Sequence, residues 1–303
     1  MLSLYMSFLQ GAFMLIMFIL GLVLGCLVLF IVQSLRLKRF DLSDQLLNLS
    51  PPKTLWGNLG YWKSGMSYSE AASNLAETLA NKAELKENDR LLDVGFGSGE
   101  QLKLWHSKFN VSDVTGLNPS QAQTAYAQAL LQQEDIHYQI LAASHQYTAQ
   151  QTRKDFTKIL AVDCAYFFRN RHQWFADCKE VMAPNSKLVL TDFILHCEPK
   201  SGLSRAMLKL AFAMCGVPLN NLTYKTNYIN SLQFVGLSNI SFEDISEPVI
   251  DGFCEWLPQY QNQFPGIKPL PIWSKYSGTV KLLTWLRKHD IIGYYLISAE
   301  RLK

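Results

Sequence analysis

Short apolar runs alternate with helical repeats along most of the chain. The runs that predict buried strands occupy residues 90–94, 111–117, 136–141, 156–162 and 187–193. Stretches with apolar residues at helical spacing lie around them, at 67–85, 100–109, 119–134 and 171–182. Because strands that alternate with helices form mostly parallel sheets covered on both faces, this order predicts an α/β fold that is Rossmann-like and doubly wound.

Polar residues mark the ends of several of these elements. Ser67 and Glu70 have the spacing of a capping box, and Pro119 with Ser120 begins the helix after the second strand. Residues 183–186 predict a turn before the strand at 187–193. Near the C-terminus we expect strands at 237–246 and 294–302 around a helix at 273–289, with a late antiparallel strand at the sheet edge.

The alternation breaks between residues 195 and 235. A strongly apolar helix is predicted at 201–217, with Arg205 and Lys209 as its only charges, followed by a polar stretch at 218–233. We interpret about 195–235 as a helical cap inserted over the carboxyl ends of the strands. Its pattern is compatible with a lid over a lipophilic acceptor, a membrane-surface helix or an ordinary packed helix.

The N-terminus differs in character from the rest. Residues 1–35 contain no Asp, Glu, Lys, Arg or His, and the apolar run 13–33 is long enough to span a bilayer, which predicts one transmembrane anchor. Basic residues follow directly at 36, 38 and 39, and they indicate that the remainder faces the cytosol. Residues 36–53 then form a juxtamembrane linker and 54–303 the globular domain. Gly21 and Gly25 have the GxxxG spacing of a weak homodimer through the span.

Composition argues against several classes of function. The six cysteines include no CxxC pair and no histidine at ligand spacing, so we expect neither a metal site nor a disulfide framework. The net charge is +3, and no basic cluster is interleaved with aromatic residues, which argues against a nucleic-acid partner. The hydrophobic fraction of 49% is high, partly because of the N-terminal run, and the bilayer is the partner that this run predicts.

A glycine loop follows the strand at 90–94. Gly95, Gly97 and Gly99 form a GxGxG pattern, and Glu100 stands where a dinucleotide-binding loop has a small residue. A carboxylate at this helix start would repel a pyrophosphate, whereas S-adenosylmethionine has a cationic sulfonium and no phosphate. Asp93 at the strand end would order the loop or approach the cationic part of the ligand. The pattern therefore predicts S-adenosylmethionine as the cofactor.

Taken with VTGLNPSQAQ and the stretch from ILAVDCAYFF to KLVLTDF, this loop resembles the class I S-adenosylmethionine-dependent methyltransferases. The similarity is to the small-molecule group of tocopherol, sarcosine and cyclopropane-synthase-like enzymes, and it covers about residues 55–303. It implies that Tyr61, beside Trp62, covers the cofactor and that Gln123 reaches the ribose. It also implies contacts from the backbone of Ala143 and from Asn118, where most relatives have an acidic residue.

Methyl transfer requires alignment of the acceptor and, for a hydroxyl or a carbon acid, removal of a proton. We expect Asp163 and Tyr166 to line the methyl site as catalytic residues, with Asp163 also touching the cofactor, and we assign neither of them a proton. His172 is more typical of an exposed helix start, and Asp192 of a strand end. Relatives often have a histidine at the position of Phe167, so the general base stays open.

These patterns together predict a membrane-anchored, S-adenosylmethionine-dependent methyltransferase that acts on a small or lipidic acceptor at the cytosolic face. Two alternatives stay open. One is a cyclopropane-type lipid alkylating enzyme, and the other is a catalytically silent relative that binds the cofactor and serves as a scaffold. The sequence leaves the acceptor atom, nitrogen, oxygen or carbon, undecided.

Overall fold

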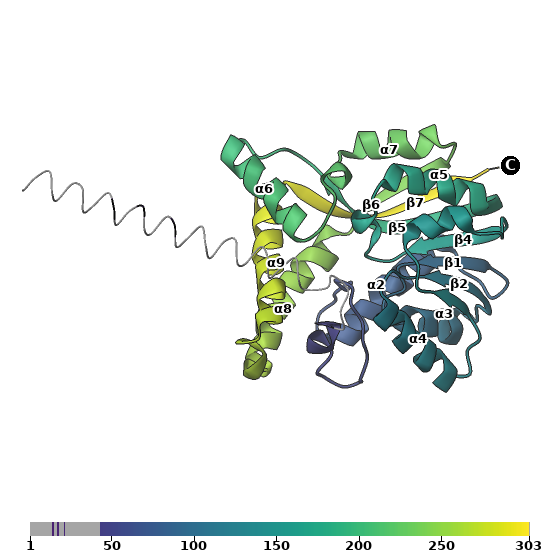
Figure 1. Ribbon diagram of the computed structural model, residues 1–303, viewed down its shortest axis with the longest axis horizontal. Coiled ribbons are helices and arrows are strands. Elements are labelled where there is room, and N and C mark those ends of the chain that lie inside the picture. Colours follow the sequence, from purple (N-terminus) through teal and green to yellow (C-terminus); the bar gives the residue numbers. More distant parts are fainter. Residues whose placement is uncertain (1–13, 15–16, 18–20, 22–42, 303) are drawn as a thin grey trace, which may run out of the picture. The chain divides into compact units, whose positions relative to one another are not determined.

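The computed structural model describes Met14, Met17, Gly21 and residues 43–302 (Figure 1). The chain divides into two units, residues 1–39 and 40–303, and the second unit contains the fold. Most of the predicted anchor, the basic residues after it and Gly25 lie outside the described residues. Within the part that is described, no helix has the length and apolar character that a membrane span needs.

A seven-stranded sheet forms the centre of the second unit, in the order β3-β2-β1-β4-β5-β7-β6. Its neighbouring pairs are parallel except those of β7, which runs antiparallel to both β5 and β6. The predicted mostly parallel, Rossmann-like sheet is confirmed, although the antiparallel strand lies inside the sheet and β6 forms the edge. The strands are β1 (Arg90–Val94), β2 (Asp113–Leu117), β3 (Gln139–Leu141), β4 (Phe156–Ala161), β5 (Met182–Leu195), β6 (Ser238–Asp244) and β7 (Ile292–Arg301).

Helices cover both faces of this sheet (Figure 1). Successive residues of a strand point to opposite faces, so Leu91 enters the core shared with α2, α3 and α4, and Leu92 enters the core shared with α5 and α7. The predicted capping box is present at Ser67 and Glu70. The helices are α2 (Tyr68–Ala83), α3 (Glu100–Phe109), α4 (Gln121–Gln133), α5 (Arg171–Val181), α6 (Gly202–Met214), α7 (Lys225–Phe234), α8 (Gly252–Gln263) and α9 (Pro271–Lys288).

Two segments differ from what the hydropathy pattern predicts. The polar stretch at 218–233 contains most of α7, whose buried Tyr228 and Leu232 pack in the core beside α5. This helix was missed because few of its residues face the core. Residues 183–186, predicted as a turn, lie inside β5, where the register with β4 shifts and Asn185 has a φ of 57°. The prediction of a turn there was wrong, because a bulge in the strand accommodates the polar residues.

The N-terminal part of the second unit packs against α8 and α9. The Leu49 N–H donates to the hydroxyl of Tyr260 at 2.9 Å, and the Trp62 ring stacks on Trp256 with ring centroids 5.0 Å apart. α8 and α9 in turn contact each other. The segment from residue 43 to 62 is therefore held by C-terminal helices that are distant in sequence.

Candidate functional site

The glycine loop joins β1 to α3 at the carboxyl edge of the sheet. Gly95, Gly97 and Gly99 have φ values of 91°, 59° and 96°, in the left-handed region that favours glycine. A Cβ at Gly95 would lie 2.6 Å from Cys164 Sγ, and one at Gly99 would lie 2.8 Å from Ala127 Cβ. A Cβ at Gly97 would meet no atom of the described residues within 4 Å. Two of the glycines therefore permit close packing, and the middle one borders open space.

Ser98 supplies an independent sign that the loop binds a ligand. The residue is 4% exposed, and its Oγ has no hydrogen-bond partner within the described residues. Buried hydroxyls in proteins are normally hydrogen-bonded, so an orphaned one beside a glycine loop fits a polar ligand that completes the site. The loop also leads directly into the N-terminus of α3.

Asp93, at the end of β1, faces α3. Its two carboxylate oxygens accept from Gln101 Nε2 at 2.8 and 2.9 Å, and one of them accepts from Trp105 Nε1 at 2.6 Å. Burial raises the pKa of Asp93 to about 6, although these hydrogen bonds favour the ionised form. Of the two roles considered for Asp93, these contacts correspond to ordering the loop and its helix.

The N-terminal segment crosses the same edge of the sheet. The Leu55 N–H donates to Glu100 Oε1 at 2.8 Å, and the Leu59 N–H donates to Asp163 Oδ2 at 2.7 Å. Glu100 therefore faces this segment at the start of α3, and burial raises its pKa. Tyr61, predicted to contact the cofactor, is half-buried at the rim of the core, and its backbone N–H donates to Ala71 O at 2.7 Å. The segment bridges the glycine loop and the end of β4.

Polar side chains also meet at the end of β2. Asn118 Nδ2 donates to Gln123 Oε1 at 3.1 Å, and both side chains are buried. Gln123 Nε2 donates in turn to Asp44 Oδ2 at 3.4 Å. Ala143 follows β3, and its N–H donates to Leu141 O at 2.9 Å. The structure thus brings Asn118 and Gln123 together and adds Asp44, which the sequence analysis did not identify.

Asp163 and Tyr166 form a second polar cluster, beyond the end of β4. Asp163 Oδ1 accepts from the hydroxyl of Tyr166 at 2.9 Å and from that of Tyr294, and the Asp163 N–H donates to Thr191 Oγ1 at 2.9 Å. Asp163 has a left-handed φ of 51°. Burial raises the pKa of Asp163 to about 6. Tyr294 comes from β7, so no local pattern around Asp163 could have revealed it.

Four carboxylates at this edge lack a salt bridge among the described residues, although Lys275 and Lys103 act on Asp44 and Glu100 from a greater distance. Asp44, Asp93, Glu100 and Asp163 form no salt bridge with any residue that the structure describes. Burial raises the pKa of each of them. Such a site repels phosphate groups and favours a ligand with positive charge, and the methionine sulfonium of S-adenosylmethionine fits it.

The comparison with known proteins agrees with this electrostatic argument. Residues 34–267 match the mycolic acid cyclopropane synthetase family. The chain belongs to this family.

Proteins that are similar in sequence to this chain include two methyltransferases. The erythromycin 3''-O-methyltransferase of Saccharopolyspora erythraea is 26% identical over 216 residues, which cover 68% of this chain and 70% of that protein. The 27-O-demethylrifamycin SV methyltransferase of Amycolatopsis mediterranei is 27% identical over 270 residues, covering 86% and 93%. A cyclopropane synthase from Mycobacterium tuberculosis has the same fold, with a TM-score of 0.68, 20% identity and coverage of 86% and 95%. The protein is an S-adenosylmethionine-dependent methyltransferase, and both the enzyme class and the cofactor are confirmed.

Two other residues that the sequence analysis considered for catalysis, Asp192 and His172, contact neighbouring side chains. Asp192 Oδ2 accepts from Arg171 Nη1 at 2.6 Å and from the Tyr228 hydroxyl at 2.9 Å, so it forms a buried ion pair on the face that α7 covers. His172 is exposed, and its ring lies 5.6 Å from that of Phe234. These contacts give both residues structural roles, although Asp192 lies near enough to Asp163 for its charge to raise the pKa of Asp163.

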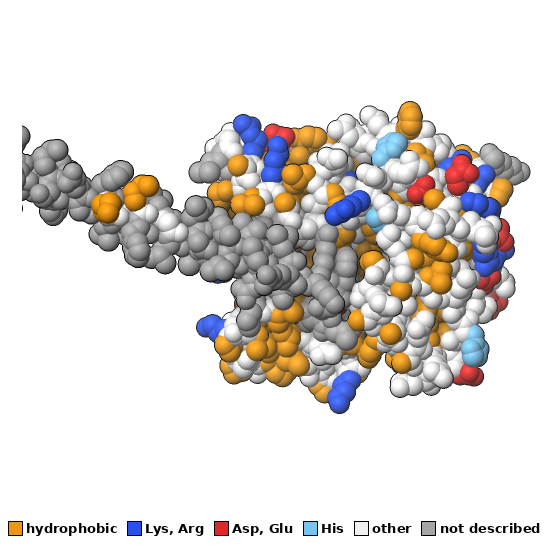
Figure 2. Space-filling model, viewed as in Figure 1, with side chains coloured by type: hydrophobic (Ala, Val, Ile, Leu, Met, Phe, Trp, Pro, Cys, Tyr) orange, Lys and Arg blue, Asp and Glu red, His pale blue; other side chains and the backbone are white. Residues whose placement is uncertain are grey.

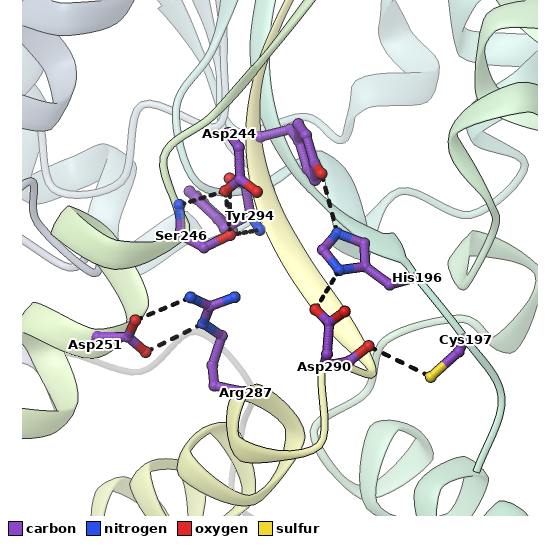
Figure 3. A network of polar contacts seen from close by, with 9 residues as sticks. His196, Cys197, Asp244, Ser246, Asp251, Arg287, Asp290 and Tyr294 are labelled. Carbon is purple, nitrogen blue, oxygen red and sulfur yellow. Dashed lines mark hydrogen bonds and ion pairs between the residues drawn. The ribbon is translucent and has the colours of Figure 1, made fainter. Parts of the chain in front are cut away.

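A polar network fixes the start of the cap segment. His196 follows β5, and its Nδ1 and Nε2 lie 2.7 Å from Asp290 Oδ1 and 3.0 Å from the Tyr295 hydroxyl (Figure 3). Cys197 Sγ donates to Asp290 O at 3.4 Å. Because Asp290 precedes β7, this network ties the segment that leads to α6 onto the sheet.

Proposed function

We propose that this methyltransferase modifies a hydroxyl of a hydrophobic acceptor, small or lipidic, at the cytosolic face of a membrane. The observation that carries the proposal is an aromatic wall between Asp163 and the cap helix α6. Its rings come from elements that are far apart in the sequence, and it surrounds the catalytic candidates with apolar surface.

The wall is continuous from the polar cluster to the cap. The Tyr166 ring lies 4.9 Å from that of Phe193, which lies 5.0 Å from Tyr294. Phe193 also contacts Phe212 of α6, edge to face, at 6.4 Å. An acceptor beside Tyr166 would therefore touch aromatic carbon on several sides, and such lining favours an apolar molecule with one polar group to orient.

Asp163 is the proton acceptor that this geometry favours. The cofactor supplies a methyl group already activated by the sulfonium, so the chain must align the acceptor and take up its proton. A hydroxyl proton that reaches the oxygen of Tyr166 can pass along the hydrogen bond to Asp163 Oδ1. With a pKa of about 6, Asp163 is mostly ionised at neutral pH and is basic enough to share that proton. A relative named as an O-methyltransferase supports oxygen as the acceptor atom.

Two features support methyl transfer at a membrane surface. One is the apolar run at 13–33, and the other is the outer side of α6. Met207 and Leu210 on that helix are 61% and 47% exposed, and Arg205 and Lys209 lie beside them in the sequence. Hydrophobic side chains gather next to Lys and Arg side chains over this helix (Figure 2). Apolar residues flanked by basic ones favour contact with anionic lipid.

The GxxxG spacing of Gly21 and Gly25 supports at most a weak homodimer. Loss of crosslinking in a Gly25→Ile variant would support a role for these glycines in pairing two chains.

Cyclopropane-type alkylation is the second candidate, because the family to which the chain belongs is described by that activity. Isotope retention separates the two reactions. Full-length protein would be incubated with membrane lipid extract and S-adenosylmethionine that has a trideuterated methyl group, and the products would be analysed by mass spectrometry. O-methylation keeps all three deuterium atoms in the product, whereas a methylene bridge keeps two. Cofactor binding without any labelled product would favour the silent scaffold instead.

A further inference from the structure

The ribose side of the cofactor site lacks a carboxylate on the sheet. In Rossmann-like folds an acidic residue about 20 positions after the glycine loop, at the end of the second strand, binds a ribose hydroxyl. In this chain that position is Asn118, an uncharged amide that donates to Gln123. Gln123 is 6% exposed and continues the chain of hydrogen bonds away from the strand.

Asp44 lies at the end of that chain. It belongs to a short 3₁₀ helix, Ser43–Leu47, in the N-terminal segment. Its Oδ2 accepts from Gln123 Nε2 at 3.4 Å, and its Oδ1 accepts from the Tyr276 hydroxyl at 3.3 Å. Both distances are long for hydrogen bonds to a carboxylate, so each oxygen can still accept a stronger bond. Residues from α4 and α9 thus converge on one carboxylate.

We propose that Asp44 binds the ribose hydroxyls of S-adenosylmethionine, so that the N-terminal segment supplies the carboxylate that is missing at Asn118. The two neighbouring hydroxyls of a ribose are donors that match the two oxygens of one carboxylate. This inference deepens the cofactor assignment and is independent of the acceptor and of the membrane.

The packing around Asp44 holds it in place. The Asn48 Nδ2 group donates to Asp44 O at 2.7 Å and to Trp56 O at 2.9 Å, which braces the 3₁₀ helix against the following segment. A Cβ at Gly57 would lie 2.7 Å from Asp44 Oδ2, so the backbone there approaches the carboxylate closely. A flexible surface carboxylate would need neither contact.

Asp44 is costly to keep ionised, which argues for a function. Burial raises its pKa from 3.8 to about 6, and Lys275 and hydrogen bonds from Tyr276 and Gln123 offset this only in part. Because the pKa is raised in the folded state, ionisation of Asp44 lowers the stability of the ligand-free protein as the pH rises above 3.8. The full penalty is present above a pH of about 6. A carboxylate retained under this penalty fits a binding role.

The test is calorimetric binding of S-adenosylhomocysteine and S-adenosylmethionine to full-length Asp44→Asn protein in detergent. Loss of a hydrogen-bonded charge predicts that affinity falls by about 10- to 100-fold for both ligands. Equal losses are expected because the ribose is common to them, whereas a role for Asp44 at the sulfonium would weaken S-adenosylmethionine alone. A 2′,3′-dideoxy analogue of S-adenosylhomocysteine, which lacks both hydroxyls, should bind wild-type and Asp44→Asn protein with nearly equal affinity.

Thermal unfolding separates binding from folding. Without ligand at pH 8, Asp44→Asn should unfold at the wild-type temperature or above it, because it removes a charge that is partly desolvated in the folded protein. The control is Asp135→Asn, since the Asp135 side chain is 95% exposed; it should leave both properties unchanged. Asp44→Asn affinity within twofold of wild type, or a loss confined to S-adenosylmethionine, would overturn the inference. Failure of the wild-type protein itself to bind either ligand would instead contradict the cofactor assignment.

Discussion

The two glycines Gly97 and Gly99 allow the loop to be tested for packing and for binding separately. Both have positive φ, so an alanine at either position adopts a left-handed conformation that costs roughly 1–2 kcal/mol. At Gly99 the new methyl group would also lie 2.8 Å from Ala127 Cβ and 3.1 Å from Ala127 Cα. At Gly97 it would meet no atom within 4 Å in the part of the chain that the structure describes.

The structure therefore predicts unequal losses of stability. Ala127 is completely buried in α4, so the helix backbone must move to accept a methyl group at Gly99, and such overpacking costs about 1–3 kcal/mol more. Gly99→Ala should lower the free energy of unfolding by about 2–5 kcal/mol and the melting temperature by roughly 5–15 °C. Gly97→Ala should lose only the conformational cost, about 1–2 kcal/mol.

The loss of affinity for S-adenosylhomocysteine should follow the opposite order, with the larger loss in Gly97→Ala. The methyl group of Gly97→Ala projects into the space beside the loop, where it competes with the cofactor, so S-adenosylhomocysteine should bind at least tenfold more weakly. Gly99→Ala, measured well below its melting temperature, should lose less affinity because its methyl group points into α4. Urea unfolding and calorimetry on the two proteins give the four values. The reasoning fails if one variant shows the larger loss in both stability and affinity.

Three further predictions concern other parts of the molecule. Arg171→Leu leaves Asp192 buried without its partner and should lower the free energy of unfolding in urea by about 3–5 kcal/mol, whereas Arg153→Leu, at a partly exposed pair, should cost at most about 1 kcal/mol. For Asp163, with a pKa of about 6, kcat/KM should fall as the pH drops below about 6 because the carboxylate becomes protonated. Asp163→Asn should reduce kcat/KM by about 10²- to 10⁴-fold, and an unchanged acid limb in this variant would exclude Asp163 as the base. In a chain lacking residues 1–39, Met207→Glu with Leu210→Glu should weaken co-sedimentation with anionic vesicles without lowering the melting temperature, and Phe234→Glu, 82% exposed on α7, should leave co-sedimentation unchanged.

The sequence by itself determined the fold class, the glycine loop and the cofactor. These depend on local features: the period of apolar residues for strands and helices, and the run from Asp93 to Glu100, whose charge favours a cationic ligand. Such features act between residues that are close in the chain, so they can be interpreted without a structure. For the same reason α7 was missed, because only its contact with α5 explains why so polar a stretch is helical.

The tertiary structure alone decided which distant residues meet at the candidate site. Tyr294 reaches Asp163 from β7, and Asp44 reaches Gln123 from the N-terminal segment, across separations of 131 and 79 residues. It also decided that Asp192 is an ion-pair partner of Arg171. No periodicity or spacing encodes these contacts, because they arise where strand ends and crossing segments meet in space. The proposal that a distant segment supplies the carboxylate absent at Asn118 therefore depends on the folded arrangement.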